Sequence, residues 1–413
     1  MVSKSLFGGA CELRSDGDMT TKWEARTLGE FVRLQRGHDL TASEQQPGNV
    51  PVMGSAGPNG THNQSLAQGD GVVIGRSGAS VGRVHFSDVA YWPHNTCLYV
   101  TDFLNNSPRF AYYLLQTLNL ASYNSGSAQP SLNRNLIYSI PVWVPARMEQ
   151  DEIVRTLQGL DDRIALLRET NTTLEAIAQA LFKSWFVDFD PVRAKLQGLA
   201  PTGMDEAAAA LFPDSFEDSA TLLCPLGWRT GKVEDLLELA YGKALKATDR
   251  VAGDVPVYGS GGLTGFHNAP LISGPTVIVG RKGTVGSMFW EDGACFPIDT
   301  VFYIRPKSPL TFCFYQLAVL GLNGMNTDGA VPGLNRNNVY RLPVVIPPLS
   351  VLAAFDDLVS ALRRRVFANE VQAQTLATLR DTLLPRLISG QLRLPHSEAA
   401  SCKIAQGTAL NLA

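Results

Sequence analysis

The feature that most constrains this chain is a single internal repeat. The matched segments, first copy and then second, are VPVMGS (50–55) with VPVYGS (255–260), GTHN (60–63) with GFHN (265–268), GRSG (75–78) with GRKG (280–283), and LNRN (132–135) with LNRN (334–337). The offset between the copies is 205 residues at the first of these pairs and 202 residues at the last. A repeat of this length is a whole domain with a connector, because solenoid modules have only about 20–50 residues. We therefore expect two related domains, suited to contact two similar targets at once.

Length and composition describe an ordinary globular chain. The 413 residues allow two or three domains, and 45% hydrophobic with 18% charged residues is typical of soluble proteins. No apolar run is long enough to span a membrane, and none near the N-terminus is long enough for an export signal. Residues 1–22 are therefore expected to be a flexible leader, and residues 396–413 a disordered tail. The six cysteines form no CxxC pair and do not recur between the copies, which predicts a reducing, cytoplasmic compartment without disulfides or a zinc site.

The net charge of −3 is low for a protein that binds nucleic acid, but the charge is unevenly distributed. Residues 201–222 contain five acidic side chains and no Lys or Arg, and we interpret this segment as an acidic linker. Residues 24–145 contain equal numbers of acidic and basic side chains, and residues 223–346 contain a small basic excess. Any basic surface must therefore be local to a few loops rather than spread over a whole domain.

Each copy contains the elements of a mixed α+β domain, at residues 23–145 and 223–346. Both domains begin with a tryptophan followed by apolar residues three apart, which predicts a short helix that ends at Gly37 or Gly242. Short β-type runs and helical stretches follow, and each domain closes with a strand that ends in proline. The expected strands are 71–75, 97–100, 141–145, 276–280, 301–304 and 343–348, and the expected helices are 110–118 and 312–320.

A heptad pattern follows each domain. Apolar residues recur at alternating spacings of four and three from Ile153 to Trp185 and from Phe355 to Leu387. This pattern predicts a coiled-coil helix in each half, about 35 residues and roughly 50 Å long. We expect a central helical region at 146–200 and a C-terminal one at 347–395, the second helix ending at Ser389-Gly390. Antiparallel packing of the two seams would place the domains at opposite ends of a rod, related by an approximate two-fold axis.

Two asparagines interrupt the apolar seams. Asn171 lies just past the middle of the first predicted helix, and Asn369 lies just before the middle of the second. A polar residue in a seam costs stability but can fix the register of the two helices. In an antiparallel pair these positions face each other, so we predict that Asn171 and Asn369 lie in the same layer or in adjacent layers.

The sequence contains no catalytic motif that recurs in both copies. It has no GxxxxGK[ST] loop, no HExxH and no GxSxG, and its histidines do not cluster as metal ligands. The nearest approach to a dinucleotide-binding fingerprint, GSGGLTG at 259–265, has Thr264 in place of the third glycine. We therefore predict no catalytic residue, no metal site and no cofactor in this chain.

Three loops recur in both copies and are predicted to contact a ligand. The first holds a Gly-Ser turn and a His-Asn pair, the second a Gly-Arg motif and the third an Asn-Arg-Asn motif. Glycine lets the backbone approach a partner closely, Arg can bind phosphate or guanine through two hydrogen bonds, and Asn fits the edge of adenine. The predicted DNA-binding residues are Ser55, His62, Asn63, Arg76, Ser77, Asn133, Arg134 and Asn135 in the first copy, and Ser260, His267, Asn268, Arg281, Lys282, Asn335, Arg336 and Asn337 in the second.

Structural alternatives stay open for several of these residues. The recurrent histidines could serve turn chemistry as readily as ligand contact, and the Asn-Arg-Asn motif could be a capped turn into the following strand. Trp185, Phe186 and Phe189 are unusually aromatic for a helix end. We predict that they form a docking patch for a partner, with packing at the tip of the rod as the alternative.

Over residues 23–395 the chain resembles the specificity subunit of Type I restriction-modification systems. The most specific segments are LFKSWFVDFDPV at 181–192 and LRDTLLPRLISG at 379–390. The stretches GRKG at 280–283 and GLNRN at 333–337 also resemble the family. The chain departs from the family in the acidic, Ala-rich insert from Asp205 to Asp218, which leaves the path into the second domain uncertain.

The resemblance implies two target-recognition domains, each binding one half of a split, asymmetric double-stranded DNA site, with antiparallel helices that set the unread gap. It implies two methyltransferase subunits that dock on the helical regions and methylate adenine with S-adenosylmethionine, and restriction subunits that use ATP and Mg²⁺. In this family the cofactors belong to the partners, and the specificity subunit is non-catalytic. The bases bound would depend on side chains that differ between the copies, such as Ser77 against Lys282.

Two other functions stay open on the residues alone. The chain could be a protein–protein scaffold that uses its two domains as docking modules. It could also be an enzyme whose site lies unrecognised in the loops, in which case the isolated chain would show turnover.

Overall fold

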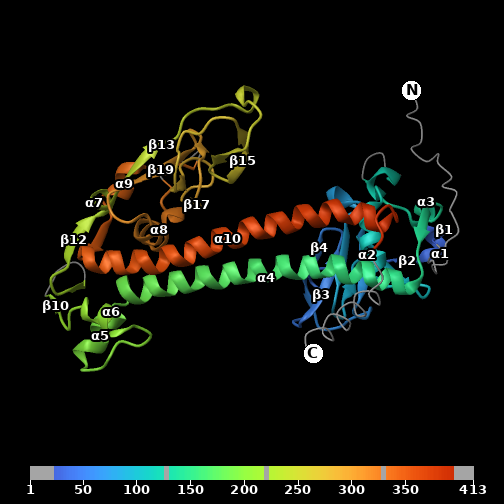
Figure 1. Cartoon of the computed structure of the whole chain (residues 1–413), viewed down its shortest axis with the longest axis horizontal. Coiled ribbons are helices and arrows are strands. Elements are labelled where there is room, and N and C mark those ends of the chain that lie inside the picture. Colours follow the sequence, from blue (N-terminus) through green and yellow to red (C-terminus); the bar gives the residue numbers. More distant parts are fainter. Residues whose placement is uncertain (1–22, 125–129, 218–222, 327–331, 395–413) are drawn as a thin grey trace, which may run out of the picture. The chain divides into compact units, whose positions relative to one another are not determined.

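A computed structural model describes residues 23–124, 130–217, 223–326 and 332–394 (Figure 1). The expected flexible leader at 1–22 and the expected tail at 396–413 lie outside the described residues. The chain divides into two compact units: unit 1 comprises residues 1–164 and 374–413, and unit 2 comprises residues 165–373. Each unit therefore holds one repeat domain together with parts of the two predicted helical regions.

The first repeat domain, in unit 1, has two main sheets. A four-stranded antiparallel sheet has the order β2–β8–β5–β6, and a three-stranded sheet has the order β4–β3–β7, in which β3 and β7 are parallel. A separate pair, β1–β9, joins the start of the domain to its end. The strands are β1 (Glu24–Thr27), β2 (Arg33–Arg36), β3 (Val50–Gly54), β4 (Gly57–His62), β5 (Gly71–Gly75), β6 (Val84–Ser87), β7 (Trp92–Pro93), β8 (Cys97–Asp102) and β9 (Pro141–Val144), and the helices are α1 (Leu28–Phe31), α2 (Pro108–Thr117) and α3 (Arg134–Ile137).

The second repeat domain, in unit 2, has the same topology strand for strand. Its sheets have the orders β13–β19–β16–β17, β15–β14–β18 and β12–β20, and the one parallel pairing, β14–β18, is the counterpart of β3–β7. The strands are β12 (Arg229–Lys232), β13 (Leu237–Tyr241), β14 (Val255–Gly259), β15 (Gly262–His267), β16 (Thr276–Gly280), β17 (Met288–Glu291), β18 (Phe296–Pro297), β19 (Val301–Pro306) and β20 (Pro343–Ile346), and the helices are α7 (Val233–Leu236), α8 (Leu310–Val319) and α9 (Arg336–Tyr340).

The expected strands, and the helices expected at 110–118 and 312–320, are confirmed. The Gly-bounded apolar runs form β5 and β16, whose residues are all buried, and the helical stretches form α2 and α8. Strands this apolar must be covered on both sides. In unit 1 the core around β5 includes Phe31, Phe110 and Tyr113, which are at most 1% exposed.

The prediction of a helix between each opening tryptophan and Gly37 or Gly242 is wrong. Only one helical turn forms, α1 between strands β1 and β2 and α7 between β12 and β13. Leu28, Phe31 and Leu34 are all buried, so the three-residue apolar spacing fits a helical turn followed by a strand as well as it fits a helix. Pairing of β2 with β8 supplies the backbone hydrogen bonds that a longer helix would have made internally.

The heptad segments form two long helices, α4 (Arg147–Phe186) and α10 (Leu349–Ile388). Every seam position named by the heptad pattern is buried or half-buried. In unit 1, Arg380 of α10 donates to Asp161 of α4 at 2.7 Å. In unit 2, Arg363 of α10 donates to Glu175 of α4 at 3.1 Å. Residues late in one helix thus pair with residues early in the other, which is the predicted antiparallel coiled coil. Among the described residues, no helix is long and apolar enough to cross a membrane.

The two seam asparagines lie together in unit 2, as the heptad pattern predicts. Asn369 is 1% exposed and its Nδ2 donates to Oδ1 of Asn171 at 2.8 Å. Asn171 in turn donates through Nδ2 to the carbonyl of Val366 at 3.2 Å. An amide in the seam destabilises the coiled coil mainly when it has no hydrogen-bond partner. The asparagine layer therefore costs little in this register and would destabilise a shifted register, in which the two amides no longer meet.

The asparagine layer yields a prediction about stability. The single variant Asn369→Leu removes the donor to Oδ1 of the half-buried Asn171, so we expect the free energy of unfolding to fall by about 1–3 kcal/mol. The double variant Asn171→Leu/Asn369→Leu should recover that loss or exceed wild type by roughly 1 kcal/mol, because an apolar layer replaces a polar one. Urea unfolding measures both, with the exposed Thr172→Leu as the control. A single variant as stable as the double would contradict a coupled pair.

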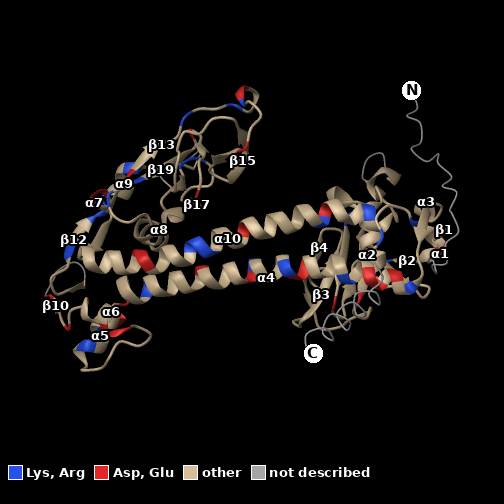
Figure 2. Ribbon diagram, viewed as in Figure 1, with Lys and Arg blue, Asp and Glu red and all other residues tan. Residues whose placement is uncertain are grey.

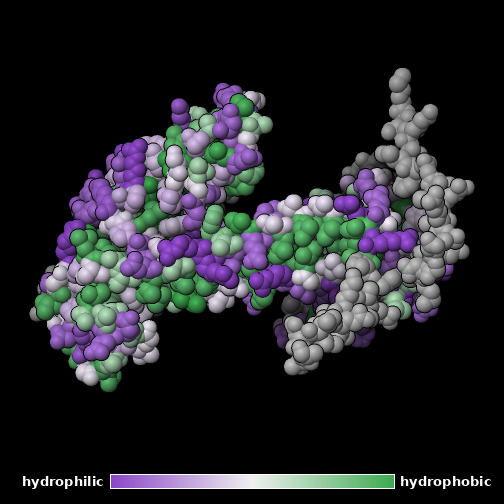
Figure 3. All heavy atoms as spheres, in the orientation of Figure 1, coloured by the Kyte–Doolittle hydropathy of each residue, from purple (hydrophilic) through white to green (hydrophobic). Residues whose placement is uncertain are grey.

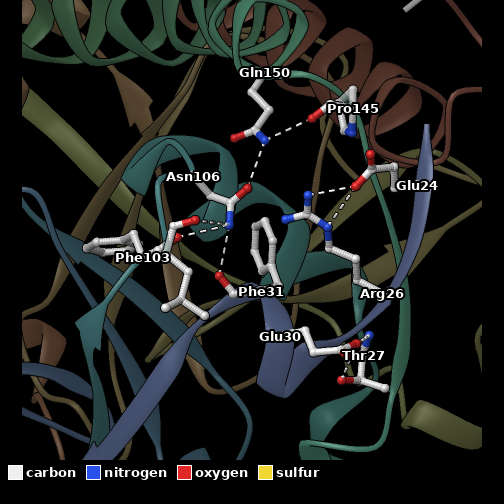
Figure 4. A network of polar contacts seen from close by, with 10 residues as sticks. Glu24, Arg26, Thr27, Glu30, Phe31, Phe103, Asn106, Pro145 and Gln150 are labelled. Atoms are coloured by element: carbon white, nitrogen blue, oxygen red, sulfur yellow. Dashed lines mark hydrogen bonds and ion pairs between the residues drawn. The ribbon is translucent and has the colours of Figure 1, made fainter. Parts of the chain in front are cut away.

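A buried amide pair joins the first domain to α4 within unit 1 (Figure 4). Asn106, on the turn before α2, donates through Nδ2 to the carbonyl of Phe31 at 2.9 Å. Gln150 of α4 donates through Nε2 to Oδ1 of Asn106 at 2.9 Å and to the carbonyl of Pro145 at 3.0 Å. Both amides are at least 95% buried, so they hold the start of α4 in one orientation on its own domain. In unit 2 a different bond serves the same junction, Thr311 Oγ1 to the Asp356 carboxylate at 2.6 Å.

The segment expected as a plain acidic linker is partly folded. Its described residues include α6 (Glu206–Ala210) and β10 (Phe216–Glu217), which pairs with β11 (Cys224–Pro225). Phe212 is 2% exposed, and its ring lies 5.1 Å from that of Trp185 and 6.1 Å from that of Trp228, centroid to centroid. The segment is therefore anchored to the core of unit 2 by one buried aromatic residue.

Candidate nucleic-acid interface

The second and third recurrent loops meet in each domain through the same backbone contacts. In the first domain the amide of Leu132 donates to the carbonyl of Arg76 at 2.8 Å. In the second domain Leu334 donates to Arg281, also at 2.8 Å. Isolated bridges pair Ser77 with Ser131 and Lys282 with Gly333. The two motifs, more than fifty residues apart in sequence, thus form one surface in both copies.

The glycines of the Gly-Arg motif are required by this geometry. A Cβ on Gly75 would lie 2.1 Å from the carbonyl oxygen of Ser80, and one on Gly280 would lie 2.1 Å from that of Thr284. The second glycine of the motif has a positive φ in both copies, +79° at Gly78 and +84° at Gly283. The motif recurs because it is a turn that only glycine can make, and the turn presents the arginine between its two glycines.

In the first domain the two loops line a pocket of about 420 Å³, here called the first pocket. Three guanidinium groups lie on it, from Arg36 at the end of β2, Arg76 of the second loop and Arg134 of the third. Arg134 is held by a hydrogen bond from Nη1 to the carbonyl of Leu34 at 2.9 Å. Its lining contains no acidic residue: Gln35, Arg36, Gly37, His38, Arg76, Leu98, Ser131, Leu132, Asn133 and Arg134.

In the second domain the same loops line a pocket of about 280 Å³, the second pocket. Two guanidinium groups flank Tyr241 at the end of β13, Arg281 at 5.2 Å and Arg336 at 5.0 Å from the ring centroid. Arg281 also donates through Nη2 to the carbonyl of Asp299 at 2.7 Å. This lining, too, is free of acidic residues: Tyr241, Arg281, Phe302, Leu334, Asn335, Arg336 and Asn337.

Basic and acidic side chains are otherwise interspersed along both units (Figure 2). The two pockets are therefore local concentrations of positive charge on domains that are close to neutral, as the charge distribution predicts.

The serine of the first loop supports the second loop. Ser55 Oγ donates to the carbonyl of Ser77 at 2.8 Å and lies 3.1 Å from that of Thr96. In the second domain the carbonyl of Ser260 accepts a hydrogen bond from Ser287 Oγ. The first loop thus lies beside the pocket, and in the first domain its serine hydroxyl is engaged inside the protein.

Each recurrent histidine makes a hydrogen bond inside its own domain. His62 is 6% exposed, and its Nδ1 accepts from the backbone amide of Gln46 at 3.1 Å. His267 makes the same bond with the amide of Val251, again sixteen residues earlier in the chain, at 3.1 Å. Each ring also packs edge-on against an aromatic ring, at 5.1 Å in the first domain and 5.7 Å in the second. These shared contacts support the turn-chemistry alternative for both histidines, and their contact with DNA stays a prediction.

All six asparagines of the recurrent loops are exposed, and three of them also make local hydrogen bonds. Asn133 and Asn335 are helix N-caps, each accepting through Oδ1 from the amide two residues later, at 3.0 and 2.9 Å. The capped-turn alternative is therefore correct for these two side-chain oxygens. Asn63 donates to Gln46 Oε1 at 2.8 Å.

The aromatic residues at the end of α4 belong to the core of unit 2, which corrects their assignment as a docking patch. Trp185, Phe186 and Phe189 are 4%, 7% and 4% exposed. The ring of Phe186 lies 5.0 Å from that of Phe312, and the ring of Phe189 lies 5.9 Å from that of Trp228. Side chains this buried cannot receive a partner while the core of unit 2 is intact.

The described part of the chain keeps its possible metal ligands apart from one another. Within those residues there is no cluster of three or more His, Cys, Asp or Glu that could hold a metal ion. Burial raises the pKa of Cys97, Cys295 and Cys313 to about 12, so these thiols stay protonated at neutral pH.

Sequence reasoning missed Arg36 and Tyr241, the pocket residues that precede Gly37 and Gly242. Matching the two copies finds what is alike, and these positions differ. The signal that could have found them is their place, directly before a glycine that recurs in both copies.

Comparisons with known proteins agree with this architecture. The family model described as the Type I restriction modification DNA specificity domain matches residues 20–176 and 225–361, more than half of the chain. The chain is 24% identical to the Type I restriction enzyme HindI specificity subunit of Haemophilus influenzae, over 69% of this chain and 77% of the relative. It is 22% identical to the MjaIX specificity subunit of Methanocaldococcus jannaschii, over 69% of each.

A solved structure shows the same fold. The S subunit of the Type I restriction-modification system from M. genitalium superposes with a TM-score of 0.62 at 17% identity, covering 91% of this chain and 98% of that one. Two copies of one α+β domain, each followed by a long helix of an antiparallel coiled coil, are thus common to both. The chain belongs to the Type I restriction-modification DNA specificity family.

Proposed function

We propose that this chain is the non-catalytic subunit that recognises double-stranded DNA for a Type I restriction-modification complex. Each repeat domain, 23–145 or 223–346, binds one half of a bipartite, asymmetric site. The helical regions at 146–200 and 347–395 set the length of the unread gap and dock two methyltransferase subunits. S-adenosylmethionine, ATP and Mg²⁺ belong to those methyltransferase subunits and to restriction subunits, not to this chain.

The observation that carries this proposal is the pair of equivalent basic pockets. The same two loops build a pocket in each domain, and the lining of each pocket contains arginines and no acidic residue. Arg binds guanine O6 and N7, or a phosphate, through two hydrogen bonds, and phosphate contacts position a protein on the duplex. Two such pockets in one chain suit a ligand with two separated contact points.

The long helices support the proposed docking role. Each has 40 residues, and several large apolar side chains face solvent on them: Leu166, Ile177, Leu358, Phe367, Val371 and Leu379. Figure 3 shows hydrophobic residues gathered along parts of both helices on the face in view. Exposed apolar stretches on otherwise regular helices are typical of surfaces that bind another protein.

Binding to random duplex DNA at increasing salt tests the function. The full chain, purified with its co-expressed methyltransferase subunits, should bind duplexes and lose roughly 10³-fold in affinity or more between about 50 and 200 mM salt. Binding selection from the same pool should enrich a split motif. A complex that assembles but binds no DNA would favour the scaffold alternative, and turnover by the isolated chain would favour the enzyme.

A further inference from the structure

One pair of equivalent positions in the two pockets differs in chemical character. Arg36 lies opposite Leu98 in the pairing of β2 with β8, and Tyr241 lies opposite Phe302 in the pairing of β13 with β19. Each precedes a glycine whose amide bonds to the start of the neighbouring strand, Gly37 to Cys97 and Gly242 to Val301. Register and loop geometry therefore make Arg36 and Tyr241 structural counterparts, and both line the pocket of their domain.

The two side chains give their pockets different characters. Arg36 adds a third guanidinium to the first pocket, and its partner is Asp39 at 3.3 Å in a pair whose side chains are 54% and 75% exposed. An ion pair this exposed is weak and can be exchanged for a ligand. Tyr241 instead places a ring among the arginines of the second pocket, 5.0 Å from the ring of Phe302, and remains 52% exposed.

The surroundings fix Tyr241 more firmly than Arg36. Phe302 and the guanidinium groups of Arg281 and Arg336 all lie around its ring, so the ring is held in place before any ligand binds. An aromatic side chain held in this way can contact an apolar group with little loss of entropy. In the major groove the only apolar group on a base edge is the methyl of thymine, whereas Arg selects guanine.

We propose that the difference between the counterparts Arg36 and Tyr241 causes the two domains to prefer different bases. The first pocket, with Arg36, takes a base pair that presents guanine. The second pocket, with Tyr241, takes a base pair that presents the thymine methyl. The inference rests on the proposed function, because it assigns a base class to each pocket of that DNA interface.

Exchanging the two side chains tests the inference. Arg36→Tyr and Tyr241→Arg are each introduced into the full chain, which is purified with its methyltransferase subunits and used to select duplexes from a random pool. We expect Arg36→Tyr to reduce preference for guanine at one position of one half-site by roughly 10-fold, leaving the other half-site unchanged. Tyr241→Arg should replace a thymine preference with guanine in the opposite half-site.

Matched controls separate specificity from charge and from folding. Arg33→Tyr changes an exposed arginine on the same strand, outside the pocket, and should leave both half-sites unchanged. Val319→Arg adds a charge at an exposed position of α8 and should do the same. Tyr241→Phe keeps the ring and should keep the thymine preference, and thermal melting shows that each variant is folded.

The outcomes distinguish this inference from the proposed function. Affinity that falls equally for all sequences, with base preferences intact, would make these residues phosphate contacts and overturn the inference. A base preference lost in Tyr241→Phe would show that the hydroxyl, not the ring, is bound, and would also overturn it. Failure of the wild-type complex to select any split motif would instead overturn the proposed function.

Discussion

Replacing Arg281 and Lys282 together with alanine should weaken DNA binding by the full complex roughly 10- to 100-fold. Arg281 is held over the second pocket by the Asp299 carbonyl and by the Tyr241 ring, so its guanidinium is already oriented for a ligand. Lys282 is the next residue along the same turn and is exposed. Loss of two cationic contacts should also reduce the steepness of the salt dependence. Fluorescence anisotropy with a selected duplex at several salt concentrations measures both effects.

A second double variant controls for net charge. Arg229→Ala/Lys232→Ala removes two exposed charges from β12 of the same domain, outside the second pocket. It should change affinity much less, and both double variants should retain the melting temperature and methyltransferase binding of wild type. Equal losses of DNA affinity in the two double variants would show that the effect depends only on net charge. Unchanged affinity in Arg281→Ala/Lys282→Ala would remove that loop from the DNA interface.

Replacing Phe186 with alanine should lower the free energy of unfolding by about 3–5 kcal/mol. The side chain is 7% exposed, and its ring lies 5.0 Å from the rings of both Phe312 and Phe355, centroid to centroid. Truncation would leave a cavity where α4, α8 and α10 meet in the core of unit 2. Urea unfolding followed by far-UV circular dichroism measures the loss.

The neighbouring residue supplies the control. Val187 is 43% exposed, so Val187→Ala should cost less than about 1 kcal/mol. A Phe186→Ala protein that is as stable as wild type but no longer binds methyltransferase subunits would restore the docking interpretation of these aromatic residues.

Much of the fold could be predicted from the sequence because the patterns that indicate its helices and strands are local and periodic. Heptad spacing depends only on residues along one helix, and the Asn171–Asn369 layer follows once two such helices pair in opposite directions. The buried strands β5 and β16 stand out as apolar runs bounded by glycine. The helix after Trp23 was wrong because three-residue spacing does not distinguish one helical turn and a strand from a continuous helix.

The errors at the candidate sites have a different origin, because burial depends on residues that are distant in sequence. The sequence around Phe186 does not indicate that its ring packs against Phe312 and Phe355. His62 recurs as His267 because both accept the same backbone hydrogen bond, and a repeat preserves such supports as faithfully as it preserves a ligand contact. Arg36 and Tyr241 escaped notice for the opposite reason, since comparing the copies finds only what they share.

The central claim is that two related domains bind two different half-sites of one DNA sequence. Single-molecule sequencing of methyladenine in DNA from cells that express this chain with its methyltransferase subunits tests it most directly. We predict one split, asymmetric motif whose two specific parts are separated by a gap of fixed length, with no such mark when this chain is absent. A continuous motif, or methylation that is the same with and without this chain, would contradict the account.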